Sequence, residues 1–252
     1  TERCAQKAVA LYHLFVRGEC LLTNARTAEM AKLTENSFRD VNIAFANELS
    51  MICDHLKINV WELIKLANRH PRVNILTPGP GVGGHCIAVD PWFIVDSAPE
   101  QAQIIRKARE INDSKPLYVI DKIKQAADQF KKPVIACLGL AFKADIDDLR
   151  ESPALDIAMS LLKDNIGEIL LVEPNIKQLP KKYADHNARL TSLPQALEQA
   201  NILVVLVDHK QFKTLHPADV ATKVVIDIVM EIKDQPKPAF AGDVVFLYHF
   251  VS

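Results

Sequence analysis

Large apolar side chains recur every three or four residues between Thr27 and Leu56, which is the spacing of one face of a helix. The stripe consists of Phe38, Val41, Phe45, Leu49, Ile52 and Leu56. We therefore expect one long helix here, with Thr27 as its N-cap. A stripe this apolar is not expected to face water over several turns. We expect residues 27–57 to form a homodimer interface, with the alternative that part of the stripe packs within the chain.

Two further helical segments follow this long helix. Asn59 and Glu62 have the spacing of a capping box, so a second helix is expected to begin at Asn59 and to end before Pro71. Residues 100–130 are amphipathic with a helical period, and Pro116 is expected to divide this stretch in two.

The pattern changes after Lys131, where short β-branched runs alternate with helical segments. The expected strands cover 133–142, 168–173, 201–208, 223–229 and 244–248, and the expected helices cover 152–164 and 193–200. This alternation is typical of βαβ units, so the predicted class is α/β: a helical domain followed by a Rossmann-like parallel sheet covered on both faces. Ligands of such sheets bind at the carboxyl ends of the strands. No GxGxxG sequence follows the first strand, so the usual dinucleotide fingerprint is absent there.

Composition and charge narrow the function classes. The 252 residues carry a formal net charge of -1, which gives no basic footprint for nucleic acid or for an anionic membrane. The longest apolar runs, such as Ile202 to Val207, are too short to span a bilayer. The chain has five cysteines without any CxxC pair: Cys4, Cys20, Cys53, Cys86 and Cys137. This usage is typical of a reducing, cytoplasmic compartment and argues against a disulfide scaffold or a metal site.

Candidate chemistry lies in a glycine-rich stretch that leads to a cysteine. Its glycines are Gly79, Gly81, Gly83 and Gly84. Glycine lets the backbone approach a ligand closely, and a thiolate two residues further on is a strong nucleophile. Asp90 follows Cys86 by one helical turn, so a carboxylate is available to move protons, although Pro91 disfavours a helical conformation at Asp90. The alternative is a flexible loop with an incidental buried thiol.

Several motifs together resemble the UDP-glucose/GDP-mannose dehydrogenase family. They are residues 28–36, Asn47-Glu48, residues 81–86 with Asp90, and residues 139–143 with Asp148, Arg150, Ser152 and Pro153. The resemblance implies an N-terminal NAD-binding domain, a central helical dimerisation domain and a C-terminal domain that binds the UDP-sugar. On this basis residues 1–25 are expected to be the tail of an otherwise missing NAD-binding domain. Residues 26–130 would form the central domain and residues 131–252 the C-terminal domain.

The same resemblance implies an enzyme that uses NAD for a four-electron oxidation of a nucleotide sugar at C6, in support of polysaccharide biosynthesis. Cys86 would trap the C6 aldehyde as a thiohemiacetal and then as a thioester, and Asp90 would assist water or proton movement. Lys32 and Asn36 are four residues apart on one helix face and match the family pair that stabilises the C6 oxyanion. Without the NAD-binding domain, this fragment is expected to be inactive.

The resemblance also implies a set of contacts to the UDP-sugar. They are Arg72, which would reach the neighbouring subunit's site, and Asn74, Gly79, Gly81, Gly83, Gly84, His85, Lys143 and Arg150. Lys143 and Arg150 are expected to contact the NAD cofactor as well. Backbone amides of a glycine-rich loop suit diphosphate oxygens, and Lys or Arg neutralises their charge. The alternative for Lys143 and Arg150 is surface pairing with Asp145, Asp147 and Asp148.

Three positions bear on the choice of sugar. His85 before Cys86 and Val89 before Asp90 are similar to members that act on UDP-N-acetyl-D-mannosamine, so a UDP-hexosamine substrate is expected. The alternatives are UDP-N-acetylglucosamine, UDP-glucose, or a nucleotide-sugar-binding module without catalysis. The chain departs from many members after Asp227, where apolar residues follow in place of Arg or Lys, so a basic substrate contact is not expected there.

Overall fold

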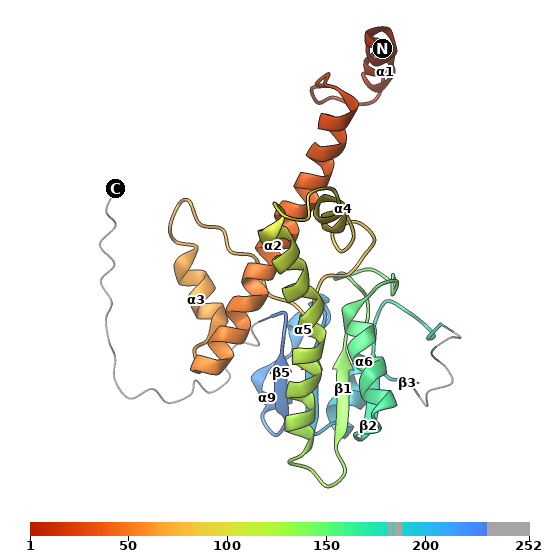
Figure 1. The fold of residues 1–252 in the computed structure, drawn as a ribbon. Helices are drawn as coiled ribbons and strands as arrows, with labels where there is room; N and C mark the ends of the chain where they lie inside the picture. The colour runs from red at the N-terminus through yellow and green to blue at the C-terminus, as the bar shows by residue number, and fades with distance from the viewer. Residues whose placement is uncertain (181–182, 184–187, 231–252) are drawn as a thin grey trace.

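The computed structural model describes residues 1–180, 183 and 188–230. Figure 1 shows a helical part joined to a sheet that is flanked by helices. The helical part contains α1 (Glu2–Tyr12), α2 (Ala25–Leu56), α3 (Val60–Ala67), α4 (Asp90–Ser97) and α5 (Gln103–Ala127). No helix among the described residues combines the length and the hydropathy that a membrane crossing requires. The strand expected at 244–248 lies outside the described residues.

Helix α2 is the long helix that the sequence predicts, but it begins three residues earlier. Asn24 is the N-cap in place of Thr27, because its side chain accepts a hydrogen bond of 2.9 Å from the Thr27 N–H. The helix ends where Lys57 adopts a left-handed conformation with φ 59°. Asn59 then caps α3 as expected, by accepting from the N–H groups of Trp61 and Glu62.

The buried face of α2 is not its apolar stripe. The buried residues are small or polar: Asn36, Ser37, Asp40, Ala44, Ala46, Asn47 and Cys53. They face α4 and α5, which pack against α2. The stripe instead faces outward, with Phe38, Phe45 and Ile52 exposed by 69%, 50% and 46%. Val41 and Leu49 are only partly buried. Most of the stripe therefore remains available for a second molecule.

The expectation that Pro116 divides residues 100–130 is wrong, because α5 continues through it. Proline leaves the carbonyl four residues earlier, that of Asn112, without its helical N–H. The helix tolerates this loss because residues before and after Pro116, such as Ala108 and Val119, are buried against neighbouring elements. One continuous helix therefore runs from the helical part, where it contacts α2 and α4, to the sheet, where it contacts α6.

Among its described residues, the C-terminal part forms a five-stranded, wholly parallel sheet in the order β3-β2-β1-β4-β5. Its strands are β1 (Val134–Leu138), β2 (Glu168–Val172), β3 (Arg189–Leu190), β4 (Ile202–Val205) and β5 (Val224–Asp227). The helical elements of this part are α6 (Pro153–Lys163), α8 (Leu193–Gln199), the short η1 (Phe212–Thr214) and α9 (Pro217–Val220). This strand order is that of a Rossmann fold, so the predicted α/β class is confirmed. Only the two-residue strand β3 lacked a sequence signal.

Strand β1 lies in the middle of the sheet and is buried on both faces. Ile135 and Cys137 belong to the core on the side of α5 and α6, whereas Ala136 and Leu138 belong to the core on the side of α8. A parallel strand that is covered on both faces has a continuous apolar sequence. For this reason β1 could be predicted from the sequence. The carboxyl ends of β1, β2 and β4 meet at one edge of the sheet, and the segment 139–152 connects β1 to α6 there.

Candidate functional site

Two residues that are distant in sequence, Asn36 and Asp90, meet between α2 and α4. The side-chain amide of Asn36 donates a hydrogen bond of 2.5 Å to Asp90 Oδ2. Asn36 is 4% exposed and Asp90 is partly buried, so this contact is partly shielded from water. The structure thus brings together two of the candidate catalytic residues.

Cys86 lies one turn before Asp90. Its carbonyl oxygen accepts hydrogen bonds from the N–H groups of Val89 at 3.0 Å and Asp90 at 2.8 Å, which closes a helical turn at the start of α4. Pro91 follows Asp90 without breaking the turn, because the missing N–H of a proline is tolerated in the first turn of a helix. The Cys86 side chain is exposed, so the incidental buried thiol of the alternative interpretation is not what the structure holds.

Lys32 lies one turn before Asn36 on α2, as the sequence predicts. Its ammonium group pairs with Glu35 at 3.1 Å, and both side chains are more than half exposed. Such a pair contributes little to stability and is easily exchanged for another partner.

The glycine-rich loop is held against the chain itself. The N–H of Gly79 donates to Asn47 Oδ1 at 2.8 Å, and the N–H of Gly84 donates to the carbonyl of Glu151 at 3.2 Å. A Cβ atom at Gly83 would lie 2.3 Å from that Glu151 carbonyl oxygen, and Gly81 has φ 142° beside the carbonyl of Asn112. Gly81 and Gly83 are therefore required for close packing between this loop, α5 and the segment 139–152.

A network of hydrogen-bonded, buried side chains on α2 and α5 holds the glycine-rich loop in place. The sequence analysis did not predict this network. Asn47 donates to Asn112 at 2.9 Å, and Asn112 donates to Asp40 Oδ1 at 2.8 Å. Arg109, which is 1% exposed, pairs with the same Asp40 oxygen at 2.5 Å. Burial raises the pKa of Asp40, and the charge of Arg109 and the hydrogen bond from Asn112 offset part of this rise. The sequence signal that could have revealed this network is the helical spacing of polar residues on α2, on the face opposite the apolar stripe.

In the segment after β1, Arg150 is already paired. Its guanidinium binds Asp148 through two contacts, Nε to Oδ1 at 2.9 Å and Nη2 to Oδ2 at 2.6 Å. These bonds lower the pKa of Asp148 to about 2, with a smaller contribution from the charge of nearby His85. The surface pairing considered as an alternative is thus present for Arg150. Lys143 is exposed.

The remaining expected contacts lie in exposed loops. Arg72 and Asn74 follow α3, in a turn that Asn68 closes by bonding both the N–H and the carbonyl of Ile75. His85 is exposed at the tip of the glycine-rich loop.

Two family models match this chain, one in its helical part and one in its sheet part. The model of the UDP-glucose/GDP-mannose dehydrogenase family, central domain, matches residues 26–114. The model of the UDP binding domain of the same family matches residues 136–234. The boundary between the two matches falls within the long helix α5 and the turn that follows it.

Relatives with high sequence identity and a solved structure are consistent with these family matches. An NDP-N-acetyl-D-galactosaminuronic acid dehydrogenase of Ralstonia solanacearum is 63% identical over 227 residues, or 90% of this chain and 53% of the relative. A UDP-N-acetyl-D-mannosamine dehydrogenase of Campylobacter jejuni is 66% identical over 213 residues, or 84% and 52%. A solved structure of the UDP-N-acetyl-mannosamine dehydrogenase of Staphylococcus aureus is 42% identical, with a TM-score of 0.79 over 93% of this chain and 55% of that one. The chain spans about half the length of the relatives that it matches.

Proposed function

Because the chain belongs to the UDP-glucose/GDP-mannose dehydrogenase family, we propose that it forms the central and UDP-binding part of an enzyme that oxidises UDP-N-acetyl-D-mannosamine to the corresponding uronate. The observation that carries the proposal is the Asn36–Asp90 contact one turn away from the exposed thiol of Cys86. A helix of the central part thereby supplies an amide and a cation, and the following loop supplies a nucleophile and a carboxylate.

The proposed reaction converts the C6 alcohol to a carboxylate, and two molecules of NAD would each accept one hydride. The Rossmann-like sheet of this chain does not fit NAD in the usual way. Two main-chain N–H groups after β1, those of Leu140 and Ala141, donate to the buried carboxylate of Glu173 and so cannot bind a pyrophosphate. We therefore assign NAD to the expected N-terminal domain, of which residues 1–25 would be the tail.

Cys86 carries the covalent step in this proposal. Its thiolate adds to the C6 aldehyde left by the first oxidation, so that a C–S bond forms and the aldehyde oxygen takes up a proton. The second oxidation converts this thiohemiacetal to a thioester. Water then attacks the thioester carbon, the C–S bond breaks, the thiolate of Cys86 leaves, and the carboxylate product remains.

The neighbouring side chains handle protons and charge. Asp90 is positioned to take a proton from the attacking water, and the hydrogen bond from Asn36 fixes its orientation. The Asn36 amide carries a second N–H, which we propose binds the C6 oxygen together with Lys32. Desolvated donors of this kind contribute about 3 kcal/mol each to a transition state. Lys32 must leave Glu35 to do so, and an exposed pair permits that exchange.

The UDP moiety is proposed to bind along the segment after β1 and the glycine-rich loop. Lys143 and Arg150 supply cations for phosphate oxygens, and their exposure leaves them accessible to the phosphates of UDP or of NAD. Asp148 aligns the guanidinium of Arg150 from one side, which leaves its outer edge for the ligand. His85 and residues 79–84 line the path from this segment to Cys86, with Asn74 at the start of the same loop.

A second candidate substrate is supported by one of the relatives. The Ralstonia relative, at 63% identity, is named for an N-acetyl-D-galactosaminuronic acid, so UDP-N-acetyl-D-galactosamine is the second candidate substrate. UDP-N-acetylglucosamine and UDP-glucose remain the alternatives that the glycine-rich loop permits.

The experiment is an NAD-dependent assay of the full-length parent against these four UDP-sugars, with Cys86→Ser as the matched variant. The wild type is expected to make the uronate of one N-acetylhexosamine, and Cys86→Ser is expected to lose nearly all of this product, since an alkoxide forms far less readily than a thiolate. In slow variants such as Asp90→Asn, mass spectrometry should find a sugar adduct on the peptide that contains Cys86. Wild-type oxidation to the uronate by Cys86→Ser would exclude the proposed mechanism.

A further inference from the structure

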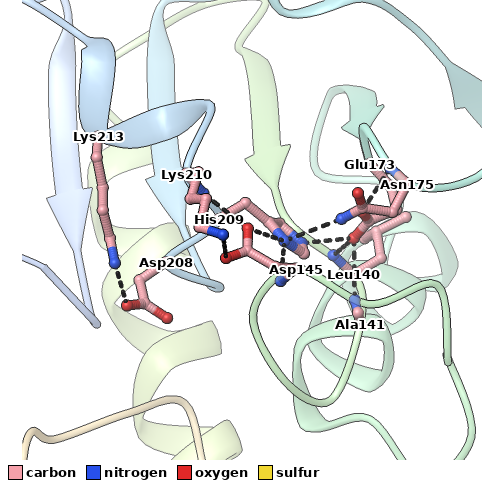
Figure 2. A network of polar contacts seen from close by, with 9 residues as sticks. All are labelled: Leu140, Ala141, Asp145, Glu173, Asn175, Asp208, His209, Lys210 and Lys213. Carbon is pink, nitrogen blue, oxygen red and sulfur yellow. Dashed lines mark hydrogen bonds and ion pairs between the residues drawn. The ribbon is translucent and has the colours of Figure 1, made fainter.

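Glu173 stands at the carboxyl end of β2 and binds the chain that leaves β1. Its carboxyl oxygen Oε2 accepts hydrogen bonds from the N–H groups of Leu140 at 2.8 Å and Ala141 at 3.1 Å, as Figure 2 shows. Glu173 is 3% exposed, so these bonds form away from water. Both donors belong to the segment that carries the proposed cations Lys143 and Arg150.

His209, in the loop that follows β4, binds the same Glu173 carboxylate. Its Nε2 lies 3.0 Å from Glu173 Oε2, and its Nδ1 accepts the N–H of Asp145 at 2.8 Å. The side-chain amide of Asn175 lies 3.1 Å from the same Nδ1. Because both neighbours of Nδ1 are donors, the ring proton is assigned to Nε2, which donates to Glu173. His209 is fully buried and packs edge-on against Phe212.

Asp145, in the segment 139–152, also contacts the loop that contains His209. Asp145 has a left-handed backbone with φ 62°, which carries strain for a residue other than glycine. Its carboxylate accepts the N–H of Lys210 at 2.9 Å, directly after His209. The N–H of Phe142 also donates to the carbonyl of Asp148 at 3.2 Å, which closes the segment on itself. Residues 140–148 are therefore held in one shape by contacts from β2, from β4 and from within.

A Rossmann sheet with this strand order normally uses these positions for a ligand. The N–H groups after β1 bind the phosphates, and an acid at the end of β2 binds the ribose. In this chain the acid at the end of β2 turns inward and binds the N–H groups itself. We propose that Glu173, oriented by His209, is a positioning residue: it fills the main-chain anion cradle after β1 and so sets residues 140–150 to receive the nucleoside diphosphate on their side chains.

This inference rests on the proposed function, because it takes the C-terminal part to be the site of the nucleoside diphosphate. The charge state of Glu173 agrees with this proposal. Burial alone would raise the pKa of Glu173, but hydrogen bonds from His209, Leu140 and Asn175 outweigh burial and hold this pKa below its usual range. Glu173 is therefore an anion at neutral pH, as a substitute for a ligand phosphate must be.

The first test measures UDP affinity and thermal stability of the whole chain in four forms: wild type, Glu173→Ala, His209→Ala and the double variant. We expect each single variant to bind UDP at least tenfold more weakly and the double variant to show little further loss, because both act through one contact. Asp208→Asn is the matched control. Asp208 precedes His209 but pairs with Lys213 at 2.9 Å, apart from the network, and its loss should leave UDP affinity within twofold. Folded Glu173→Ala with wild-type affinity would overturn the proposal.

The second test needs no variant and applies even where Glu173→Ala fails to fold. Nitrogen NMR of the wild-type chain should show the proton of His209 on Nε2 and slowly exchanging amide protons at Leu140 and Ala141. A proton on Nδ1, or rapid exchange at both amides, would overturn the proposal. Failure of the wild-type chain to bind UDP, with this NMR signature intact, would instead count against the proposed function alone.

Discussion

At the scale of single residues, the candidate site separates groups that react from groups that hold them. Cys86 is exposed, whereas Asn36, which contacts Asp90, is almost fully buried. A hydrogen bond from a buried amide fixes the direction of the Asp90 carboxylate without adding charge. Lys32 brings charge from the exposed side of the same helix. If Lys32 leaves Glu35, the proposed site would combine a mobile cation with a fixed amide, as stabilisation of an oxyanion requires.

Glu173 leads to a prediction about pH. Its folded-state pKa is lowered, so the stability that its ionised form contributes is complete above the ordinary glutamate pKa of about 4.3 and is lost as the pH falls through the folded value. The difference in free energy of unfolding between wild type and Glu173→Gln should therefore stay constant from pH 7 to about 5 and shrink below about 4.3. Urea unfolding at several pH values measures it. A difference that grows as the pH falls from 7 to 5 would mean that the folded pKa is raised.

At the scale of elements, the contact between the glycine-rich loop and the segment 139–152 joins the two parts of the chain. The loop comes from the helical part and leads into Cys86, and the segment comes from the sheet and carries Arg150. The N–H of Gly84 bonds the carbonyl of Glu151, whose own φ of 48° is left-handed. Strained, well-anchored backbone of this kind is typical of ligand sites.

Gly83 offers a sharp test of this junction. In Gly83→Ala the new Cβ would lie 2.3 Å from the Glu151 carbonyl oxygen and 2.7 Å from Pro153, so backbone must move and unfolding free energy should fall by about 1–3 kcal/mol. Gly79→Ala is the control in the same loop, because the nearest atom there is 3.8 Å away. It should change stability by less than about 0.5 kcal/mol. Equal urea midpoints for the two variants would show that the loop does not pack as described.

The elements also show what sequence patterns can and cannot predict. Strands β1, β2 and β4 are short buried apolar runs, and their alternation with helices was enough to predict the parallel sheet. The buried face of α2 was not predictable from hydrophobicity, because Asp40 and Asn47 are buried by partners on α5 that lie more than 60 residues away. The continuity of α5 through Pro116 likewise depends on packing along its length, which no local pattern encodes.

At the scale of the whole molecule, α5 unites the two parts that the family models treat separately. It packs against α2, α4 and α6, so the Asn36–Asp90 contact and the cations after β1 are connected through one helix. A nucleotide bound at the sheet and a sugar C6 at Cys86 would thus be held by a single framework. The sequence suggested candidate residues at each end of this framework, and their roles stay predictions. It did not predict the Asp40–Arg109 and Glu173–His209 contacts that fix their spacing, since each pairs groups from separate elements.

The outer face of the molecule leads to the last prediction, a homodimer through α2. Phe38, Phe45 and Ile52 lie on this helix and are all at least 46% exposed, which leaves an apolar stripe over several turns. We propose that a second copy covers it and that Arg72 of each copy reaches toward the other copy's site. Sedimentation should show a dimer for the wild-type chain and a monomer for Phe45→Glu, because a buried unpaired carboxylate opposes association. Leu117→Glu, at a residue 65% exposed on α5, serves as the control and should remain dimeric. An unchanged dimer for Phe45→Glu would place the interface on another face, and with it the assignment of Arg72 to a neighbouring site would lose its basis.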